Sequence, residues 1–315
     1  MPKILTVGEI LVELVATTKG DGFRDAQPFF GPFPSGAPAI FVDQVGKIGG
    51  AAAIIGRVGD DDFGHLNIDR LARDDVDISG IEIAPGEVTG CAFVRYREDG
   101  SRAFLFTMHQ SATAMLSVTP SGAALMESCD HLHIMGTALA APGMADTALE
   151  ALRRVKARGG TLSFDPNLRP ELIDTPGMRD RLDKILAQTD IFMPSGRELF
   201  LFSNDKTEAH AVTDLLARGI REIVLKRGAQ GASFFSSEER FDVGPVPVEE
   251  VDPTGAGDSF GGVYVALRLA GSRPADALHR ANAAGALAVT RLGPMEGTST
   301  NAEIDDFLKK QKALS

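Results

Sequence analysis

The most chemically informative segment of the chain is residues 251–260, which read VDPTGAGDSF. Small residues at 255–257 let backbone N–H groups point at one spot, and an apolar, helix-compatible run follows, so the turn is suited to holding an anion at a helix N-terminus. Asp258 could simply cap that helix, and the glycines could simply form a turn. A carboxylate repels a bound anion, so we expect one beside an anion site only where it takes part in the reaction. The presence of both Asp252 and Asp258 at this spacing therefore favours a catalytic site.

This segment resembles the C-terminal signature of the ribokinase-like (PfkB) family of carbohydrate kinases. In that family the Gly-Ala-Gly backbone forms an anion hole for the phosphoryl group in transit, and the closing aspartate takes a proton from the sugar hydroxyl. The resemblance implies that Gly255, Ala256 and Gly257 form the anion hole and that Asp258 is the general base. It also implies ATP and Mg²⁺ as cofactors, and it leaves open a monovalent cation such as K⁺.

The composition places limits on the fold and on the partners. A chain of 315 residues with 43% hydrophobic content can bury a sizeable core in one large α/β domain or two small ones. The net charge of −11 argues against nucleic acid or an anionic membrane as partner. Cys91 and Cys129 are too few for a disulfide framework or a zinc site. With neither a signal peptide nor a long apolar segment, we expect a cytoplasmic protein.

The elements that must position the turn follow a recognisable order. From residue 130 onward, predicted strands at 131–135, 161–164, 191–193 and 222–225 alternate with helical stretches. This alternation predicts a mostly parallel sheet with helices on both faces. Because the resemblance covers nearly the whole chain, it implies a ribokinase-like three-layer α/β/α fold and a single carbohydrate kinase domain over residues 1–315.

A β-hairpin interrupts this α/β pattern. Residues 88–97 and 102–108 are β-rich, and the Asp-Gly step in the connection 98–101 is a strong hairpin signal. The resemblance implies a small β-stranded lid over the sugar, contributed by about residues 9–36 and 88–108. In the family this lid is often also a dimer contact, so a homodimer through the lid is possible.

Polar residues follow the predicted strands at their carboxyl ends, where ligands of such sheets bind. Asp165, Asn167 and Arg169 match the family block Asp-x-Asn-x-Arg. Ser195 and Glu198 form a Ser-x-x-Glu pair, which is equally well explained as a helix capping box or as a family element whose glutamate organises magnesium through water. Asp252 could hold the metal of the nucleotide or hold the turn itself.

Two further segments resemble the nucleotide side of the family. Lys226 or Arg227, in the segment 226–232, could face phosphate or be a solvated turn residue, and the small residues of 282–286 indicate either an adenine-side helix or close helix packing. The three aspartates 60–62 are better explained by a turn and a helix N-terminus than by a metal. The implied nucleotide-binding residues are Ser195, Lys226, Gly228, Gly231, Ala256, Gly257, Asn282 and Ala286, and the implied metal residues are Glu198 and Asp252.

The substrate is the least determined feature. Ser35 and Gly36 stand in an N-terminal element whose small residues let a sugar approach the backbone, although Ser35 and Ile40 depart from the family pattern Gly-Gly-x-x-x-Asn. A keto-deoxy sugar acid carries a carboxylate, so its binding site would favour a positively charged side chain after the hairpin. Residues 104–111 contain no side chain that is certain to be charged at neutral pH, although Arg169 remains available. The expected substrate-binding residues are Glu13, Ser35, Gly36, Gln110, Asn167, Arg169 and Asp258.

Taken over its whole length, the sequence is most similar to tagatose and fructose kinases. We therefore predict transfer of the γ-phosphoryl group of ATP to the terminal hydroxyl of D-tagatose or D-fructose, with 2-keto-3-deoxygluconate as the alternative substrate. A non-catalytic sugar-sensing protein on a kinase scaffold is a second alternative, which Asp258 argues against. A dinucleotide-dependent oxidoreductase is disfavoured because no G-x-G-x-x-G follows the first strand.

Overall fold

A nine-stranded sheet runs through the centre of the molecule. The computed structural model describes residues 2–168, 176–203 and 207–314, and within them the strand order is β13-β12-β11-β10-β9-β8-β1-β4-β5. Every strand pair from β5 to β11 is parallel, whereas β12 and β13 pair antiparallel at one edge. The strands are β1 Ile4–Val7, β4 Ala52–Gly59, β5 Val76–Ala84, β8 His131–Met135, β9 Thr161–Asp165, β10 Ile191–Phe192, β11 Glu222–Lys226, β12 Ala232–Phe235 and β13 Arg240–Val243.

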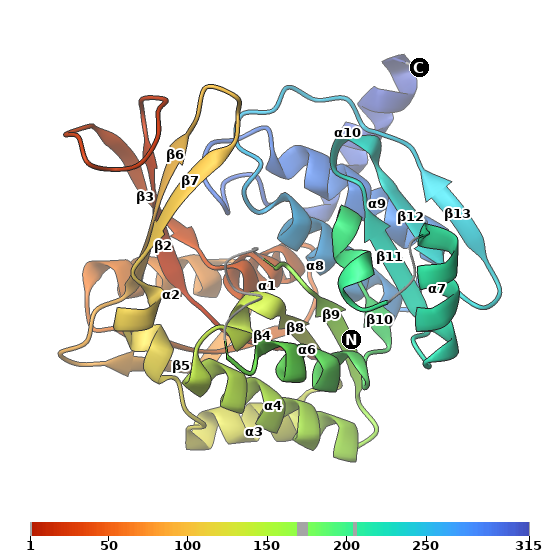
Figure 1. Cartoon of the computed structure of the whole chain (residues 1–315), viewed down its shortest axis with the longest axis horizontal. Helices are drawn as coiled ribbons and strands as arrows, with labels where there is room; N and C mark the ends of the chain where they lie inside the picture. The colour runs from red at the N-terminus through yellow and green to blue at the C-terminus, as the bar shows by residue number, and fades with distance from the viewer. Residues whose placement is uncertain (1, 169–175, 204–206, 315) are drawn as a thin grey trace.

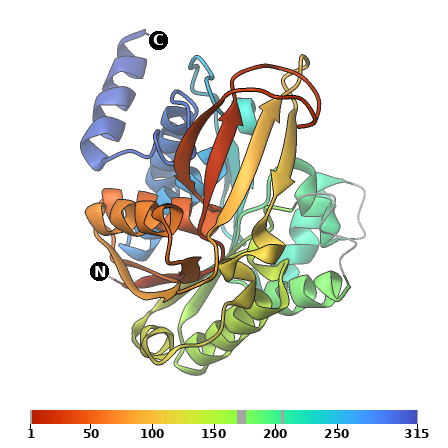
Figure 2. The ribbon, with the colours of Figure 1, turned by 90° about the vertical axis from the view of Figure 1, so that its left-hand side faces the viewer.

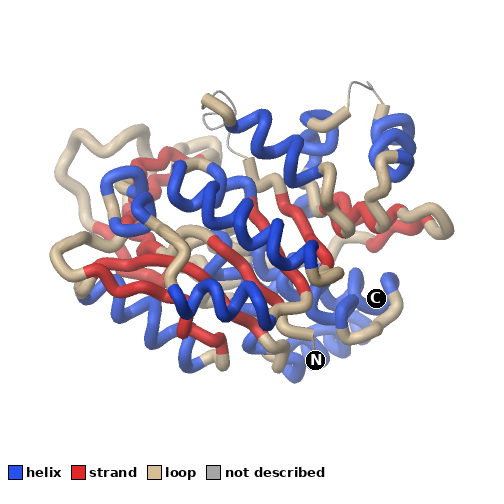
Figure 3. The backbone as a smooth tube through the Cα atoms, turned by 90° about the horizontal axis from the view of Figure 1, so that it is seen from below, coloured by secondary structure: helices blue, strands red, loops and turns tan. Residues whose placement is uncertain are grey.

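Helices cover both faces of this sheet, as Figure 3 shows. One face carries α1 Ala37–Lys47, α2 Asp62–Arg73, α8 Ala256–Leu269, α9 Pro274–Ala288 and α10 Asn301–Leu314. The other face carries α3 Pro120–Ser128, α4 Pro142–Ala157, α6 Met178–Leu186 and α7 Glu208–Ala217. Successive strand residues point to opposite faces, so Ile54 packs in one hydrophobic cluster and Ile55 in the other. The predicted three-layer α/β/α architecture is confirmed.

A second, smaller sheet projects beside the first. Its order is β3-β2-β6-β7, made of β2 Leu11–Ala16, β3 Phe29–Ser35, β6 Gly90–Tyr96 and β7 Arg102–Phe106. The two central strands are parallel, and each outer strand pairs antiparallel with its neighbour. Figures 1 and 2 show this small sheet rising from the body of the molecule. Its strands come from the two segments predicted for the lid, and Gly100 takes the left-handed conformation (φ 80°) in the predicted hairpin turn.

Some boundaries differ from expectation. The helix that follows the anion-hole turn already begins at Ala256, because Gly255 turns the chain directly into α8, and the helix that contains residues 282–286 ends at Ala288. Sequence reasoning did not place β4, β5, α3 or β13. Asp61 is the N-cap of α2 and accepts a hydrogen bond from the Gly64 N–H at 2.8 Å, so the helix-terminus interpretation of the 60–62 aspartates holds. None of the described helices has the length and apolar character needed to cross a membrane.

Candidate active site

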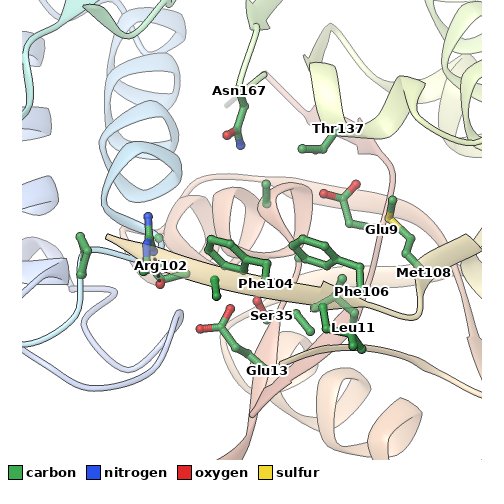
Figure 4. Close-up of a pocket in the computed structure, with 18 of the residues that line it drawn as sticks. Glu9, Leu11, Glu13, Ser35, Arg102, Phe104, Phe106, Met108, Thr137 and Asn167 are labelled. Atoms are coloured by element: carbon green, nitrogen blue, oxygen red, sulfur yellow. Dashed lines mark hydrogen bonds between the residues drawn. The ribbon is translucent and has the colours of Figure 1, made fainter. Parts of the chain in front are cut away.

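A deep cavity lies between the small sheet and the carboxyl ends of the large sheet. Its volume is about 1350 Å³, and Figure 4 shows side chains from the small sheet and from segments that follow strands of the large sheet pointing into it. The strands of the small sheet supply one wall, and the residues that follow β9 and precede α8 supply the opposite wall. The cavity brings together most of the residues predicted from the anion-hole and sugar motifs, which are Glu13, Ser35, Gly36, Asn167, Gly255, Gly257 and Asp258. It also contains Ser195 and Lys226, which were predicted for the nucleotide side.

The N-terminus of α8 opens into this cavity. Gly255 is the N-cap in the left-handed conformation (φ 81°), and a Cβ there would lie 2.3 Å from the Pro294 carbonyl oxygen, so only glycine fits. At Gly257 an added Cβ would meet only the Lys226 Nζ, at 3.5 Å. The first turn of the helix therefore presents open backbone to the cavity, as an anion site requires.

Asp258 lies in the first turn of α8 with its side chain buried. The Asn167 Nδ2 donates to its Oδ1 at 3.4 Å. Asn167 takes a positive φ of 38° directly after β9, and the Asp165 Oδ1 holds this turn by accepting the Asn167 N–H at 3.2 Å. The turn after β9 thus aims an amide at the carboxylate predicted to be the general base.

A buried cation lies beside the same helix terminus. Lys226, the last residue of β11, forms an ion pair with Asp165. Burial acts to lower the pKa of Lys226, but the charges of Asp165, Glu198 and Asp258 outweigh it and raise the pKa, so the ammonium stays charged. Burial and the charge of Asp165 raise the pKa of Glu198. The ammonium lies beside the first turn of α8, since its Nζ would be 3.5 Å from a Cβ added at Gly257.

Ser195 and Glu198 form the predicted capping box at the start of a 3₁₀ helix, Gly196–Leu201. The Glu198 Oε2 accepts the Ser195 N–H at 2.7 Å and its Oε1 accepts the Leu168 N–H at 2.8 Å. Each carboxylate oxygen keeps a further lone pair, which fits Mg²⁺ organised through water. Among the described residues, no group of three or more His, Cys, Asp or Glu side chains could hold a metal directly.

Comparisons with known proteins agree with this geometry. A family model described as "pfkB family carbohydrate kinase" matches residues 1–301. The chain belongs to this family of carbohydrate kinases. Fructokinase-1 from Oryza sativa subsp. japonica is 33% identical over 314 residues, which cover 96% of each chain. "Probable fructokinase-4" from Arabidopsis thaliana is 32% identical over 317 residues, covering 97% of this chain and 96% of the relative.

Solved structures are similar over the same length. The "putative Ribokinase II" from E. coli, in complex with ATP and Mg²⁺, is 49% identical with a TM-score of 0.93, covering 98% of this kinase and all of that chain. Fructokinase from Vibrio cholerae O395, with bound fructose, ADP and calcium ion, is 28% identical with a TM-score of 0.84, covering 98% and 99% of the two chains. The predicted ribokinase-like fold and the assignment as a carbohydrate kinase are confirmed.

Asp252 does not line the cavity of this kinase. Its buried carboxylate accepts the Tyr96 hydroxyl at 2.7 Å and the Thr254 N–H at 3.0 Å on Oδ1, and the Gly293 N–H at 3.0 Å on Oδ2. In this arrangement Asp252 fastens the turn, which is the second of the two roles predicted for it.

Several other predicted residues lie outside the cavity. Gln110 is exposed in a 3₁₀ helix, Met108–Gln110, while its neighbour Met108 does line the cavity. Arg227 pairs with Glu208 and does not line the cavity. Arg169 lies outside the described residues.

The residues predicted for the nucleoside side also lie away from the cavity wall. A Cβ on Gly231 would come within 2.1 Å of the Val243 carbonyl oxygen, and the Asn282 Nδ2 donates to the Gly244 carbonyl oxygen at 2.9 Å. Close packing of α9 on α8 accounts for the small residues of 282–286, since a Cβ on Gly285 would lie 3.2 Å from the Ala256 oxygen. Gly228 and Ala286 are likewise not in the cavity wall. Ala256, the first residue of α8, is not in the wall either, although Gly257 next to it is.

Sequence reasoning missed several residues that line the cavity. Arg102, Phe104 and Phe106 point into it from β7, and the two phenylalanine rings stack with centroids 5.4 Å apart (Figure 4). Their spacing of two residues on a predicted strand was a signal that they share one face. Glu9 follows β1 and is buried in the cavity wall, but a single carboxylate at a strand end carried no comparable pattern.

Proposed function

We propose that this kinase transfers the γ-phosphoryl group of ATP to the terminal hydroxyl of a ketohexose, D-fructose or D-tagatose. The observation that carries the proposal is the cavity itself, whose volume of about 1350 Å³ adjoins the N-terminus of α8 with Asp258 in its first turn. The relatives named fructokinases and the fructose-bound neighbour support this class of substrate.

The wall of the cavity favours a neutral sugar. Glu9 and Glu13 are both buried there, and carboxylates are strong acceptors for sugar hydroxyls. A third carboxylate, brought by 2-keto-3-deoxygluconate, would be repelled by these two. The rings of Phe104 and Phe106 offer an apolar surface to the C–H face of a sugar. Arg102 also lines this wall, and its Nη1 donates to the Thr254 hydroxyl.

Phosphoryl transfer at this site would use a general base, groups that stabilise the charge of the transferred phosphoryl group, and a bound metal ion. Asp258 would accept the proton of the sugar hydroxyl, with Asn167 orienting its carboxylate. The N–H groups of the first turn of α8 and the Lys226 ammonium would stabilise the charge of the transferred group. Bound Mg²⁺ would neutralise the charge of the nucleotide phosphates, with Glu198 as its contact through water.

The remaining nucleotide residues stay part of the proposal. Ser195 and Lys226 line the cavity and would face the phosphates. The loop with Gly228 and Gly231 and the helix with Asn282 and Ala286 would contact the nucleoside, and the ATP-bound E. coli neighbour supports ATP as donor. Activation by K⁺ is included, since a Vibrio cholerae O395 fructokinase double mutant, 28% identical with a TM-score of 0.85, contains potassium ion together with fructose and ADP.

We also propose one kinase domain over residues 1–315, a cytoplasmic location and a homodimer through the small sheet. Phe30 and Leu105 on its outer strands are 55% and 46% exposed, which favours an apolar contact there.

Both cysteines, Cys91 and Cys129, are unpaired thiols, as expected in a reducing compartment. Neither nucleic acid nor a membrane is proposed as a partner, given the net charge of −11.

The test is a coupled assay of ADP release with a panel of D-fructose, D-tagatose, D-ribose and 2-keto-3-deoxygluconate. We expect the highest kcat/KM for one of the two ketohexoses. A higher kcat/KM for the sugar acid would overturn the substrate class while leaving the kinase assignment intact. Sugar binding without turnover of any panel member would instead favour the sensing protein.

A further inference from the structure

Two side chains of the small sheet reach the turn that precedes the anion hole. The Tyr96 hydroxyl donates to the Asp252 Oδ1 at 2.7 Å, and the Arg102 Nη1 donates to the Thr254 Oγ1 at 2.8 Å. Tyr96 and Arg102 are direct partners across the β6–β7 hairpin, so one point of the small sheet makes both contacts. Each contact joins residues more than 150 positions apart in the chain, 156 and 152 respectively.

The side chain of Asp252 joins three segments at this point. Besides the Tyr96 hydroxyl it accepts the Thr254 N–H at 3.0 Å, within its own turn, and the Gly293 N–H at 3.0 Å, from the loop after α9. Asp252 is 1% exposed, so water does not compete for these bonds. The backbone leading into Gly255 therefore takes its path from bonds that include the small sheet.

The two donors are well suited to this task. Burial, reinforced by the charge of Asp252, raises the pKa of Tyr96, so its hydroxyl keeps the proton that it donates. The Arg102 guanidinium also lies 5.3 Å from the ring centroid of Phe104, in the cavity wall. Arg102 therefore contacts both the wall expected to hold the sugar and the turn expected to hold the phosphoryl group.

We propose that Tyr96 and Arg102 are positioning residues for phosphoryl transfer, which fasten the anion-hole turn to the small sheet. The inference rests on the proposed reaction at this turn. The small sheet would then do more than cover the sugar, because its contacts fix the turn 252–254 and thereby the N–H groups of α8. Loss of one such hydrogen bond is expected to lower kcat by about three- to tenfold and to change the KM for the sugar less.

The first experiment compares Tyr96→Phe with a matched control, Tyr264→Phe. The Tyr264 hydroxyl also donates to a carboxylate at 2.7 Å, that of Glu222, but it lies on α8 outside the cavity. We expect the kcat of Tyr96→Phe to fall three- to tenfold and that of Tyr264→Phe to stay within twofold. Equal kcat values for the two variants would overturn the proposal. An inactive wild-type protein would instead count against the proposed function.

A double-mutant cycle tests the second contact and does not depend on the stability of the tyrosine variant. Arg102→Met and Thr254→Val each remove one partner and keep a similar shape. We expect Arg102→Met to lower kcat at least threefold more in the wild-type background than in Thr254→Val. Equal effects in the two backgrounds would show that Arg102 does not act through the turn.

Discussion

At the scale of single residues, Asp258 and Lys226 carry the chemistry proposed for the cavity. Asp258 lies in the first turn of α8 and Lys226 ends β11, so one helix terminus gathers a carboxylate and an ammonium. The two side chains have different tasks, since one would accept a proton and the other would offset negative charge. Substitutions that remove each task separately therefore give distinguishable results.

We predict that Asp258→Asn lowers kcat by about 10²-fold or more, the usual contribution of a general base. Asparagine keeps the size and can still cap the helix, but it cannot accept the proton of the sugar hydroxyl. Steady-state ADP release at saturating ATP and fructose or tagatose measures the effect, and a thermal melt confirms that the variant folds. Turnover close to wild type would contradict the role of Asp258 as the base.

We predict that Lys226→Met lowers kcat by about 10²-fold and also destabilises the protein, because it leaves Asp165 buried without its cation. The control is the double variant Asp165→Asn with Lys226→Met. It should recover stability in urea unfolding, since the uncompensated charge is gone, while kcat stays low. Recovery of kcat together with stability would show that Lys226 is only structural.

At the scale of elements, the start of α8 contains two glycines that are needed for different reasons. Gly255 needs its positive φ and has the Pro294 oxygen within 2.3 Å of an added Cβ, whereas Gly257 lies inside the helix with open space before it. The first glycine is thus required by the path of the chain. The second keeps the space above the helix terminus open for an anion.

We predict that Gly257→Ala lowers kcat at least tenfold with an unchanged or slightly raised melting temperature, because alanine favours the helix by about 1 kcal/mol while its methyl group occupies the anion site. Gly255→Ala should instead lower the melting temperature by several degrees, because its backbone conformation disfavours a side chain. Thermal melts and ADP-release assays on both variants check this contrast. A destabilised Gly257→Ala with normal kcat would contradict it.

At the scale of the whole molecule, a buried network joins α1, α2 and the loop after α9. The Arg70 Nε donates to the Asp43 Oδ1 at 2.9 Å, and the Arg70 Nη2 donates to the Met295 carbonyl oxygen at 2.6 Å and to the Thr298 Oγ1 at 2.9 Å. The same loop supplies Gly293, whose N–H binds Asp252. Packing on the α1 side of the sheet is thus connected to the turn of the active site.

The network makes stability depend on pH. Burial raises the pKa of Asp43 to about 6, although the bonds from Arg70 oppose this shift. The pKa of an aspartate in the unfolded chain is about 4. At pH values between about 4 and the pKa of Asp43 in the folded protein, the folded protein binds more protons than the unfolded chain, so the free energy of unfolding falls as pH rises. Relative to Asp43→Asn, we predict that the wild-type protein loses at most about 3 kcal/mol of stability from pH 4 to 6.5. Urea unfolding across this range measures the difference, and parallel pH profiles for the two proteins would contradict the prediction.

The sequence by itself determined the features that depend on neighbours along the chain. The glycine turn before Asp258, the hairpin at residues 98–101 and the capping box of Ser195 and Glu198 are set by bonds within a few residues, so their residue types identify them. Alternating apolar segments likewise predicted the layered fold, because sheet and helix periodicities are local properties.

Only the tertiary structure decided which distant side chains meet. Asp165 and Lys226 are 61 positions apart and pair because β9 and β11 end at the same edge of the sheet, with β10 between them. Asp252 fastens the turn because Tyr96 and Gly293 reach it, from 156 and 41 positions away. Strand order and the placement of the small sheet over the large one arise from packing of whole faces, which no local pattern of residues specifies.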